Sequence, residues 1–212
     1  CIRDRNRLGS VGEPVPGCEQ RIAEDGEVLI RGPMVFVGYL HNAEATASTI
    51  DPEGWLHTGD IGTIDDDGYL WITGRKKELI ITSGGKNISP EKIENALKTS
   101  PYINEAVAIG DGQKFISALL QIEYDVVADW ATRENIQYTS FPDLSSNAEV
   151  VKMLDGEVHR CNELLPRVAQ VRQCRTLPKE LNEDDGELTA TRKVRRRNVL
   201  AAYESLITDI YG

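Results

Sequence analysis

Two charged side chains in this 212-residue sequence follow glycine-containing turns and could bind an oxygen-rich ligand. Asp60 ends the run GWLHTGD, and a carboxylate there can accept two hydrogen bonds from vicinal hydroxyls, such as those of a ribose. Arg75 carries five donors in a fixed fork and stays charged, which suits ribose oxygens or a phosphate. Each residue also has a structural explanation, because a turn aspartate can stabilise its own backbone and a surface arginine can make a weak ion pair.

A second candidate is the loop Ser83-Gly84-Gly85-Lys86-Asn87, which suggests a phosphate-binding loop. That interpretation fails, because the required earlier glycine is absent and Asn87 stands where a Ser or Thr would hold magnesium. Two consecutive glycines still allow a ligand to approach the backbone closely. Judged on this loop alone, an ordinary turn between a strand and a helix is the better explanation.

The third candidate is Lys193, which lies in a basic run at residues 192–197. This run is expected at the start of a helix, where the helix dipole disfavours cations, so the run requires an anionic partner. A bound anion would be a functional partner. The acidic loop at residues 183–187 could supply the same charge without any function.

The elements that must position these residues begin with a β-rich stretch. We predict, in order, a strand at 27–31, a helix near 42–50, and a hairpin with arms at 61–64 and 69–73. Asn42 could cap the helix. The Asp-Gly pair at 67–68 is a strong hairpin signal, because glycine adopts positive φ at little cost. Asp60 would then lie at the start of the first arm.

Beyond the hairpin, the order of the elements predicts a compact α+β domain. We predict strands at 78–82, 105–109 and 116–123, and helices opened by Ser89-Pro90 and at about 125–135, 148–165 and 197–210. Ser89 could cap the first of these helices, and Pro90 suits its first position. Ile93, Ala96 and Leu97 share one helical face by their spacing. The Ser-, Thr- and Pro-containing stretch at 138–147 is predicted to be a loop.

The overall composition excludes several classes of protein. The formal net charge of −10 argues against general nucleic-acid binding, which depends on neutralising phosphates. Four scattered cysteines and three distant histidines offer no disulfide framework and no metal-ligand spacing, so we expect reduced thiols in a cytosolic protein and no structural metal. No apolar stretch approaches the roughly 20 residues that span a bilayer.

Three segments, taken in order, resemble one protein family. They are GWLHTGD at 54–60, then GRKKE at 74–78 with SGGKNISPEKIE at 83–94, and finally GELTATRKVRR at 186–196. With RLGSVGEP at 7–14 and GYL at 38–40, they are similar to the adenylate-forming enzymes, which include acyl-CoA synthetases, firefly-type luciferases and nonribosomal-peptide adenylation domains. Each motif is weak by itself, but the ordered set is specific and covers nearly the whole chain.

The resemblance implies a role for each candidate residue. Asp60 would hold the ribose of ATP, and Arg75 would contact the same nucleotide. Lys77 would be the hinge about which a mobile lid domain rotates. Ser83, Gly84, Gly85 and Lys86 would line the path of coenzyme A. Lys193 would be the catalytic residue, contacting both the substrate carboxylate and the α-phosphate, where an ammonium offsets the repulsion between two anions.

The resemblance also implies a division of the chain. Residues 1–75 would be the distal β-rich subdomain of a large N-terminal domain, and residues 76–212 would be the whole α+β lid domain. The family's first phosphate loop, its adenine- and magnesium-binding segment and its acyl pocket have no counterpart in this sequence. We therefore expect a C-terminal fragment that is inactive alone.

The implied reaction joins a carboxylate to ATP, giving acyl-AMP and pyrophosphate, and then to CoA, giving a thioester. The length of residues 124–177 and the run LTATRKVR are most similar to bacterial long-chain fatty acid–CoA ligases, although Ala190 replaces the usual proline. The implied small molecules are a fatty acid, ATP, CoA and Mg²⁺, with the Mg²⁺ ligands in the missing part. The implied location is the cytoplasm, with peripheral membrane contact through that missing part. Oligomeric state stays open.

Three alternatives compete with this interpretation. The parent enzyme could be an acyl-AMP ligase that loads a carrier protein instead of CoA. The chain could instead be a non-catalytic interaction module that uses the lid fold. A nucleic-acid module built on residues 192–197 ranks last, because only Tyr203 and Tyr211 follow that run as stacking platforms.

Overall fold

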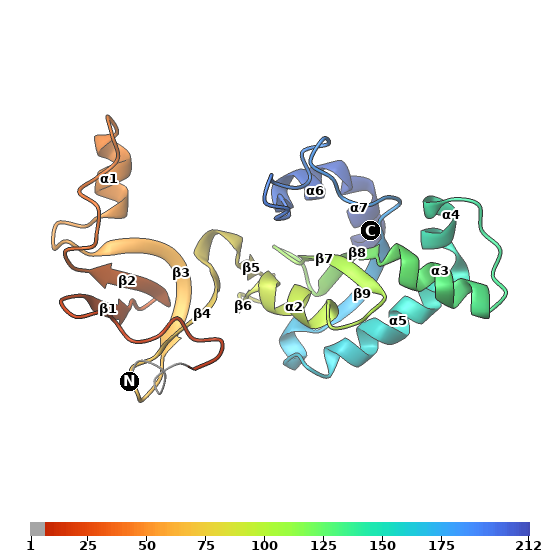
Figure 1. Cartoon of the computed structure of the whole chain (residues 1–212), viewed down its shortest axis with the longest axis horizontal. Helices are drawn as coiled ribbons and strands as arrows, with labels where there is room; N and C mark the ends of the chain where they lie inside the picture. The colour runs from red at the N-terminus through yellow and green to blue at the C-terminus, as the bar shows by residue number, and fades with distance from the viewer. Residues whose placement is uncertain (1–6) are drawn as a thin grey trace. The chain divides into compact units, whose positions relative to one another are not determined.

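The computed structural model describes residues 7–212, and it contains two compact units. The first unit ends at Leu79, and the second comprises Ile80–Gly212. Figure 1 shows that strands are the main regular elements of the first unit and that the second mixes strands with helices. The α+β fold class expected from the sequence is therefore confirmed.

The first unit is built on a four-stranded antiparallel sheet in the order β1-β2-β3-β4. Its elements are β1 Glu19–Ile22, β2 Glu27–Arg31, α1 Ala43–Thr49, β3 Leu56–Ile64, β4 Leu70–Arg75, and a 3₁₀ turn at Lys76–Glu78. The predicted strand at 27–31 and the predicted helix near 42–50 are both confirmed. Asn42 caps α1 as expected, because its side-chain oxygen accepts a hydrogen bond from the N–H of Ala45 at 2.9 Å.

The β3–β4 hairpin forms where the Asp-Gly signal predicted it. At its tip, Gly68 has a φ of +87°, a value that favours glycine. The carboxylate of Asp65 accepts hydrogen bonds from the N–H groups of Asp67 and Tyr69 and from the indole N–H of Trp71. These bonds lock the turn and so fix the register in which β3 and β4 pair.

The second unit combines a three-stranded sheet and a small two-stranded sheet with a set of helices. Its elements are β5 Ile80–Ile81, β6 Asn87–Ile88, α2 Pro90–Leu97, β7 Ile103–Ile109, β8 Ile116–Ile122, α3 Tyr124–Arg133, α4 Phe141–Ser146, α5 Ala148–Asn162, a 3₁₀ turn at Arg167–Ala169, β9 Val171–Thr176, α6 Arg196–Ala202 and α7 Glu204–Tyr211. Strands β7 and β8 pair antiparallel, and β9 joins β8 in parallel after the helical excursion α3–α5.

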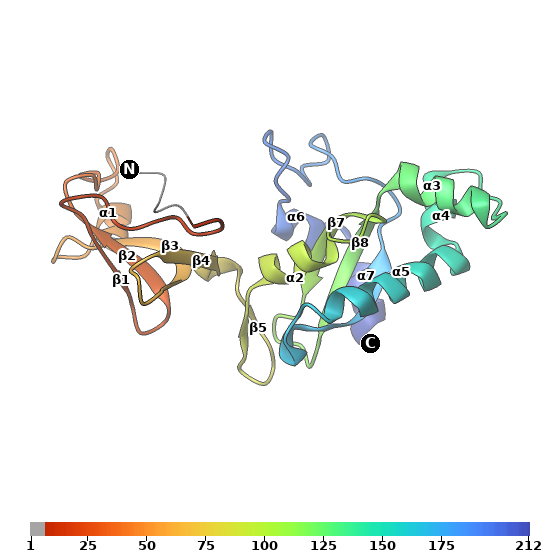
Figure 2. The same cartoon turned by 60° about the horizontal axis from the view of Figure 1, so that its bottom comes forward.

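The sheet of the second unit is covered by helices on both faces, as Figures 1 and 2 show. One face contributes Ala106, Ala118 and Leu120 to a core shared with α2, α3 and α5. The other face contributes Val107 and Leu119 to a core shared with α6 and α7. This alternation follows from the two-residue period of a strand, and it leaves β7 and β8 almost fully buried.

Several sequence-based expectations for the second unit are wrong in detail. The strand predicted at 78–82 is a 3₁₀ turn followed by only two strand residues, Ile80 and Ile81. The loop predicted at 138–147 contains α4, which Ser140 caps. The helix predicted at 197–210 is broken at Tyr203, and strand β9 was not predicted. Ser89 precedes α2, but its side chain makes no capping hydrogen bond.

Among the helices of residues 7–212, none combines the length and the apolar composition needed to cross a membrane.

Candidate functional site

Asp60 and Arg75 face each other across the β3–β4 ladder. They are register partners, and Arg75 Nε lies 2.9 Å from Asp60 Oδ1. The Arg75 side chain is 60% exposed and that of Asp60 is 27% exposed, so both can reach a ligand. Asp60 lies within β3 rather than at its start, contrary to the prediction. The arrangement leaves Asp60 Oδ2 without a hydrogen-bond donor from residues 7–212, so this oxygen can accept bonds from a hydroxyl.

A buried carboxylate supports this pair from the neighbouring strand. Glu27 in β2 is 4% exposed. It accepts a hydrogen bond from the N–H of Gly59 at 2.9 Å and from Lys76 Nζ at 2.9 Å, and its Oε2 lies 3.0 Å from Nδ1 of His57. Glu27 therefore bonds both Gly59, which precedes Asp60, and Lys76, which follows Arg75.

The charge of Glu27 is stabilised by these partners. Burial would raise the pKa of Glu27, but the hydrogen bonds from His57, Lys76 and the N–H of Gly59 outweigh it, and the pKa lies below its usual value. The pKa of Lys76 is raised because its ammonium bonds the carboxylates of Asp25 and Glu27. At neutral pH the cluster is therefore a network of paired charges.

Side-chain bonding to the first unit stops directly after Lys76. Lys77 lies in the 3₁₀ turn, is exposed, and makes no side-chain hydrogen bond or ion pair with any residue from Arg7 to Gly212. The boundary between the two units follows at Leu79–Ile80. Lys76 is thus the last residue after β4 whose side chain bonds the first unit through Asp25 and Glu27. Lys77, which follows it, makes no such bond with the described residues.

The Gly84-Gly85 loop connects β5 to β6 in the second unit. Gly85 has a φ of +72°, and a Cβ built on it would meet nothing within 4 Å. The loop is closed by a hydrogen bond from the N–H of Gly85 to Thr82 O at 2.8 Å and by another from the N–H of Ser83 to Gln113 O at 2.9 Å. The loop is therefore closed by hydrogen bonds, and its backbone at Gly84 and Gly85 is exposed and free of side-chain cover.

This loop forms one wall of a basic groove with a volume of about 720 Å³. Thr82, Ser83, Gly84 and Lys86 line one side, and the other side includes Phe115, Val168 and Gln170. Four cations line the groove, namely Lys86, Lys114, Arg167 and Arg172, and no acidic residue does. None of these four has an ion-pair partner among residues 7–212, so the groove favours an anionic ligand.

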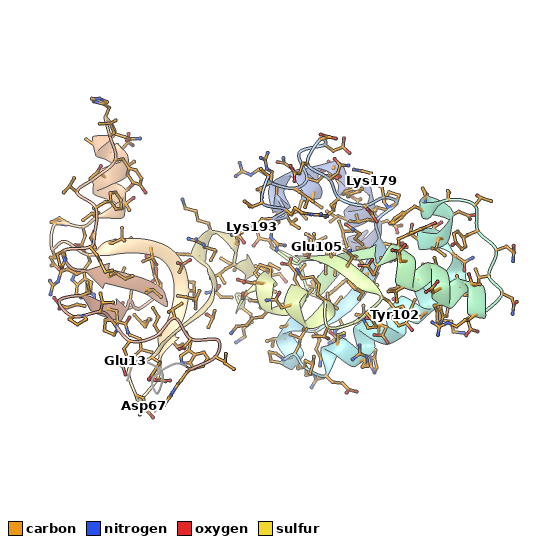
Figure 3. The ribbon with its side chains drawn as sticks, viewed as in Figure 1. Glu13, Asp67, Tyr102, Glu105, Lys179 and Lys193 are labelled. Atoms are coloured by element: carbon orange, nitrogen blue, oxygen red, sulfur yellow. The ribbon has the colours of Figure 1, made fainter. Side chains whose placement is uncertain are left out.

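Lys193 lies on a tight turn before α6 (Figure 3). The N–H of Thr189 bonds Lys193 O at 2.8 Å, and the N–H of Lys193 bonds Thr189 Oγ1 at 3.0 Å. Arg192 within this turn has a φ of +59°, which is uncommon for a residue other than glycine. The Lys193 side chain is exposed and has no partner among the described residues. Its backbone is thus fixed while its ammonium stays available.

A buried carboxylate also holds the base of this turn. Glu187, whose side chain is 3% exposed, accepts hydrogen bonds from Lys179 Nζ at 2.7 Å and from the Tyr203 hydroxyl at 2.9 Å. Burial and this bond to Glu187 raise the pKa of Tyr203 to about 12. The acidic loop at 183–187 therefore pairs with Lys179, whose position Figure 3 marks, and not with the basic run at 192–197.

The Gly84-Gly85 loop and the Lys193 turn lie apart on the second unit. In Figure 2 the loop after β5 projects at the bottom of this unit, and the segment before α6 projects at its top. Lys193 is not among the residues that line the basic groove beside this loop. The structure therefore does not bring the four loop residues Ser83–Lys86 together with Lys193.

Within residues 7–212, no group of three or more His, Cys, Asp or Glu side chains could hold a metal ion.

Sequence reasoning missed the two buried carboxylates and the basic groove. Glu27 did carry a signal, since it is a charged residue in the otherwise apolar strand start EVLI. Glu187 carried none, because it stands among other acidic residues of a surface loop. The cations at Arg167 and Arg172 meet Lys86 only through the fold.

Comparison with known proteins gives matches along nearly the whole chain. The family model described as AMP-binding enzyme C-terminal domain matches residues 77–212. The chain is 42% identical over 207 residues to the long-chain-fatty-acid–CoA ligase FadD15 of Mycobacterium tuberculosis, which covers 97% of the chain and 34% of that protein. It is 37% identical over 228 residues to the long-chain-fatty-acid–CoA ligase ACSBG1 of Rattus norvegicus, covering 97% of the chain and 32% of that protein. The chain thus spans about a third of the length of these relatives.

Solved structures show the same fold. The A domain of carboxylic acid reductase from Segniliparus rugosus, in complex with AMP, matches with a TM-score of 0.77 at 20% identity, over 98% of this chain and 33% of that one. The O-succinylbenzoate coenzyme A synthetase of Bacillus subtilis, also in complex with AMP, matches with a TM-score of 0.62 at 27% identity, over 90% of this chain and 35% of that one.

Proposed function

This chain belongs to the AMP-binding enzyme family, and on that premise we propose that it supplies the moving part of an ATP-dependent long-chain fatty acid–CoA ligase. In this proposal residues 1–75 end the large adenylating domain and residues 76–212 form the lid. The chain corresponds to the C-terminal part of long-chain fatty acid–CoA ligases. We propose a long-chain fatty acid as substrate because those relatives are long-chain-fatty-acid–CoA ligases. We propose the reaction from the side-chain environments of Asp60, Arg75 and Lys193.

The observation that carries the proposal is the state of Lys193. Its N–H and its C=O are both hydrogen-bonded to Thr189, and its ammonium is exposed and unpaired within residues 7–212. Two other cations of this region are used differently, since Lys179 is paired with Asp185 and Glu187, and Arg196 is paired with Glu94. A fixed but unpaired cation suits a group that must neutralise negative charge on a substrate.

The first half-reaction would use this cation. A carboxylate oxygen of the fatty acid attacks the α-phosphorus of ATP, and the bond from that phosphorus to the pyrophosphate oxygen breaks. Lys193 would lie between the two anions, where it lowers their repulsion and stabilises the charge that builds up during transfer. Mg²⁺ would neutralise further phosphate charge, with ligands outside this chain.

Asp60 and Arg75 would hold the nucleotide during this step. The free Oδ2 of Asp60 can accept hydrogen bonds from the ribose hydroxyls, and Arg75 can donate from its exposed guanidinium. The ion pair between them restrains both side chains at the β3–β4 edge. Such restraint reduces the entropy lost when the ligand is bound.

The second half-reaction would use the other side of the lid. The CoA sulfur attacks the acyl carbon of acyl-AMP, and AMP leaves. Ser83, Gly84, Gly85 and Lys86 would line the pantetheine path, and the four cations of the basic groove would attract the phosphates of CoA. This loop and Lys193 lie apart on one unit, and rotation about Lys77 would present each in turn.

We place this ligase in the cytoplasm, where ATP and CoA are available, with peripheral membrane contact through the large domain. Its other partners would be small molecules, and nucleic acid is not among them.

The test compares the two half-reactions in the full-length ligase. Lys193→Ala should strongly reduce pyrophosphate release from ATP and fatty acid, whereas thioester formation from supplied acyl-AMP should persist. Lys152→Ala, at an exposed α5 residue with no partner among residues 7–212, is the matched control and should change neither step. Equal loss of both steps in Lys193→Ala would contradict the role proposed for Lys193. Acyl transfer to a carrier protein but not to CoA would favour the acyl-AMP ligase.

A further inference from the structure

We propose that Arg196 and Glu94 form a positioning pair that fixes the Lys193 turn against the edge of β7. The inference rests on the proposed role of Lys193 and adds two residues to that site. Neither residue would touch substrate. Both would act by setting where the Lys193 backbone lies.

The pair closes a ring of hydrogen bonds on the β7 backbone. Arg196 donates from one terminal nitrogen to Ala108 O at 2.7 Å and from the other to the carboxylate of Glu94. The same carboxylate accepts the N–H of Ala108 at 2.8 Å. The side chains of Glu94 and Arg196 are only 15% and 21% exposed. One carboxylate and one guanidinium thus bond both backbone groups of a single strand residue.

Helix stability does not explain an arginine at this position. Arg196 is the first residue of α6, where the helix dipole disfavours a cation. Its Nε is also buried without a partner, which is an unfavourable state for a polar group. What distinguishes this arginine is therefore the set of groups that its terminal nitrogens bind. They join a segment three positions after Lys193 to a strand that is distant in sequence.

The Lys193 turn is consequently held from both sides. On its N-terminal side, Glu187 is fixed by Lys179 and Tyr203. On its C-terminal side, Arg196 is fixed by Glu94 and Ala108. Two anchors around a short turn restrict the position of Lys193, and misplacing a reacting group by about 1 Å can cost about 100-fold in rate.

The Gly84-Gly85 loop does not depend on this pair. It is held by the hydrogen bond from the N–H of Ser83 to Gln113 O and by that from the N–H of Ile81 to Asp111 Oδ1 at 3.0 Å. Neither bond involves Glu94 or Arg196. Loss of the pair should therefore impair adenylation and spare the step that uses CoA.

The first experiment measures amide hydrogen exchange in this 212-residue chain by mass spectrometry. Arg196→Gln should accelerate exchange at residues 188–195 by about tenfold or more and leave residues 80–88 unchanged. Arg197→Gln is the matched control, because Arg197 is the exposed neighbour without a partner in the described part of the chain. Arg196→Lys and Glu94→Gln serve as milder variants if Arg196→Gln does not fold. Unchanged exchange at 188–195 in a folded variant would overturn the inference.

The second experiment is a double-mutant cycle in the full-length ligase. Arg196→Lys should lower adenylation by about 10- to 100-fold with thioester formation from acyl-AMP unchanged. Added to Lys193→Ala, it should lower adenylation no further, because a positioning residue acts only through Lys193. Fully additive losses, or no loss in Arg196→Lys, would overturn the inference while the role of Lys193 stands. If Lys193→Ala itself leaves adenylation intact, the proposed function fails, and the role of Arg196 fails with it.

Discussion

Replacing Glu187 tests whether a buried carboxylate holds the base of the Lys193 turn. Its Oε1 accepts from the Tyr203 hydroxyl, and its Oε2 accepts from Lys179 Nζ and, at 3.2 Å, from the N–H of Asn182. Glu187→Gln can keep the contacts to Lys179 and Asn182 through its amide oxygen, and its NH₂ can donate to the Tyr203 oxygen, which reverses the direction of that bond. Glu187→Ala removes the acceptor altogether. The two variants therefore separate loss of charge from loss of hydrogen bonds.

The expected destabilisation differs between these two variants. Glu187→Gln loses only the charge-assisted part of the bonds, about 1–2 kcal/mol. Glu187→Ala leaves the Tyr203 hydroxyl and the Asn182 N–H unsatisfied, and breaking a buried ion pair by removing one partner costs about 3–5 kcal/mol. Because the Lys179 side chain is 41% exposed and keeps Asp185, we expect the lower end, about 3 kcal/mol.

The assay is the free energy of unfolding of the second unit. It is measured from hydrogen exchange of buried β7 and β8 amides as a function of urea, so that the first unit does not contribute. Glu183→Gln is the control, since Glu183 is exposed in the same acidic loop, and it should stay within about 0.5 kcal/mol of the parent. The reasoning is refuted if Glu187→Ala is no less stable than this control.

Three further predictions concern other buried groups. Gly62→Ala should destabilise the first unit by about 1–3 kcal/mol in thermal unfolding, because its Cβ would lie 2.7 Å from the backbone oxygen of Trp71; an unchanged midpoint would contradict this close packing. Cys174 should react with iodoacetamide far more slowly than the partly exposed Cys18, because burial and a neighbouring carboxylate raise the pKa of Cys174 to about 12; peptide mass mapping measures both rates. Since the pKa of Glu27 in the folded state lies below 4.5, its stabilisation of the first unit is present above that pH and lost as pH falls through the folded value. Glu27→Gln should flatten the acid-unfolding curve, and an unaltered curve would exclude this contribution.

Local signals in the sequence were sufficient where one turn or one cap decides the structure. The hairpin tip at Asp67-Gly68 and the cap at Asn42 are examples, because both rest on bonds between close neighbours. Ser89 failed as a cap although its residue type was suitable, since its side chain makes no bond to the start of α2. Strand β9 was missed because its burial does not alternate, so its buried positions Val171 and Cys174 give no two-residue period.

Contacts between residues that are distant in sequence determine the features that the sequence did not predict. The predicted helix at 197–210 is broken at Tyr203, whose hydroxyl is directed to Glu187 in the preceding loop. For the candidate site, the sequence named Asp60, Arg75 and Lys193, and the structure adds the direct contact between the first two. Glu27 carried a signal as a charged residue in an apolar strand start, but its partners could not be predicted, and neither could those of Glu94, because only the fold brings these residues together.

The hydrogen-bond ring at Ala108 has a consequence for solubility. Strand β7 is an edge of its sheet, and an open edge can recruit a strand from another molecule. Glu94 and Arg196 occupy the N–H and C=O of Ala108, so an incoming strand would have to break a largely buried ion pair before it could continue the sheet. By occupying these two backbone groups, the side chains of Glu94 and Arg196 disfavour the addition of a strand from another molecule at Ala108.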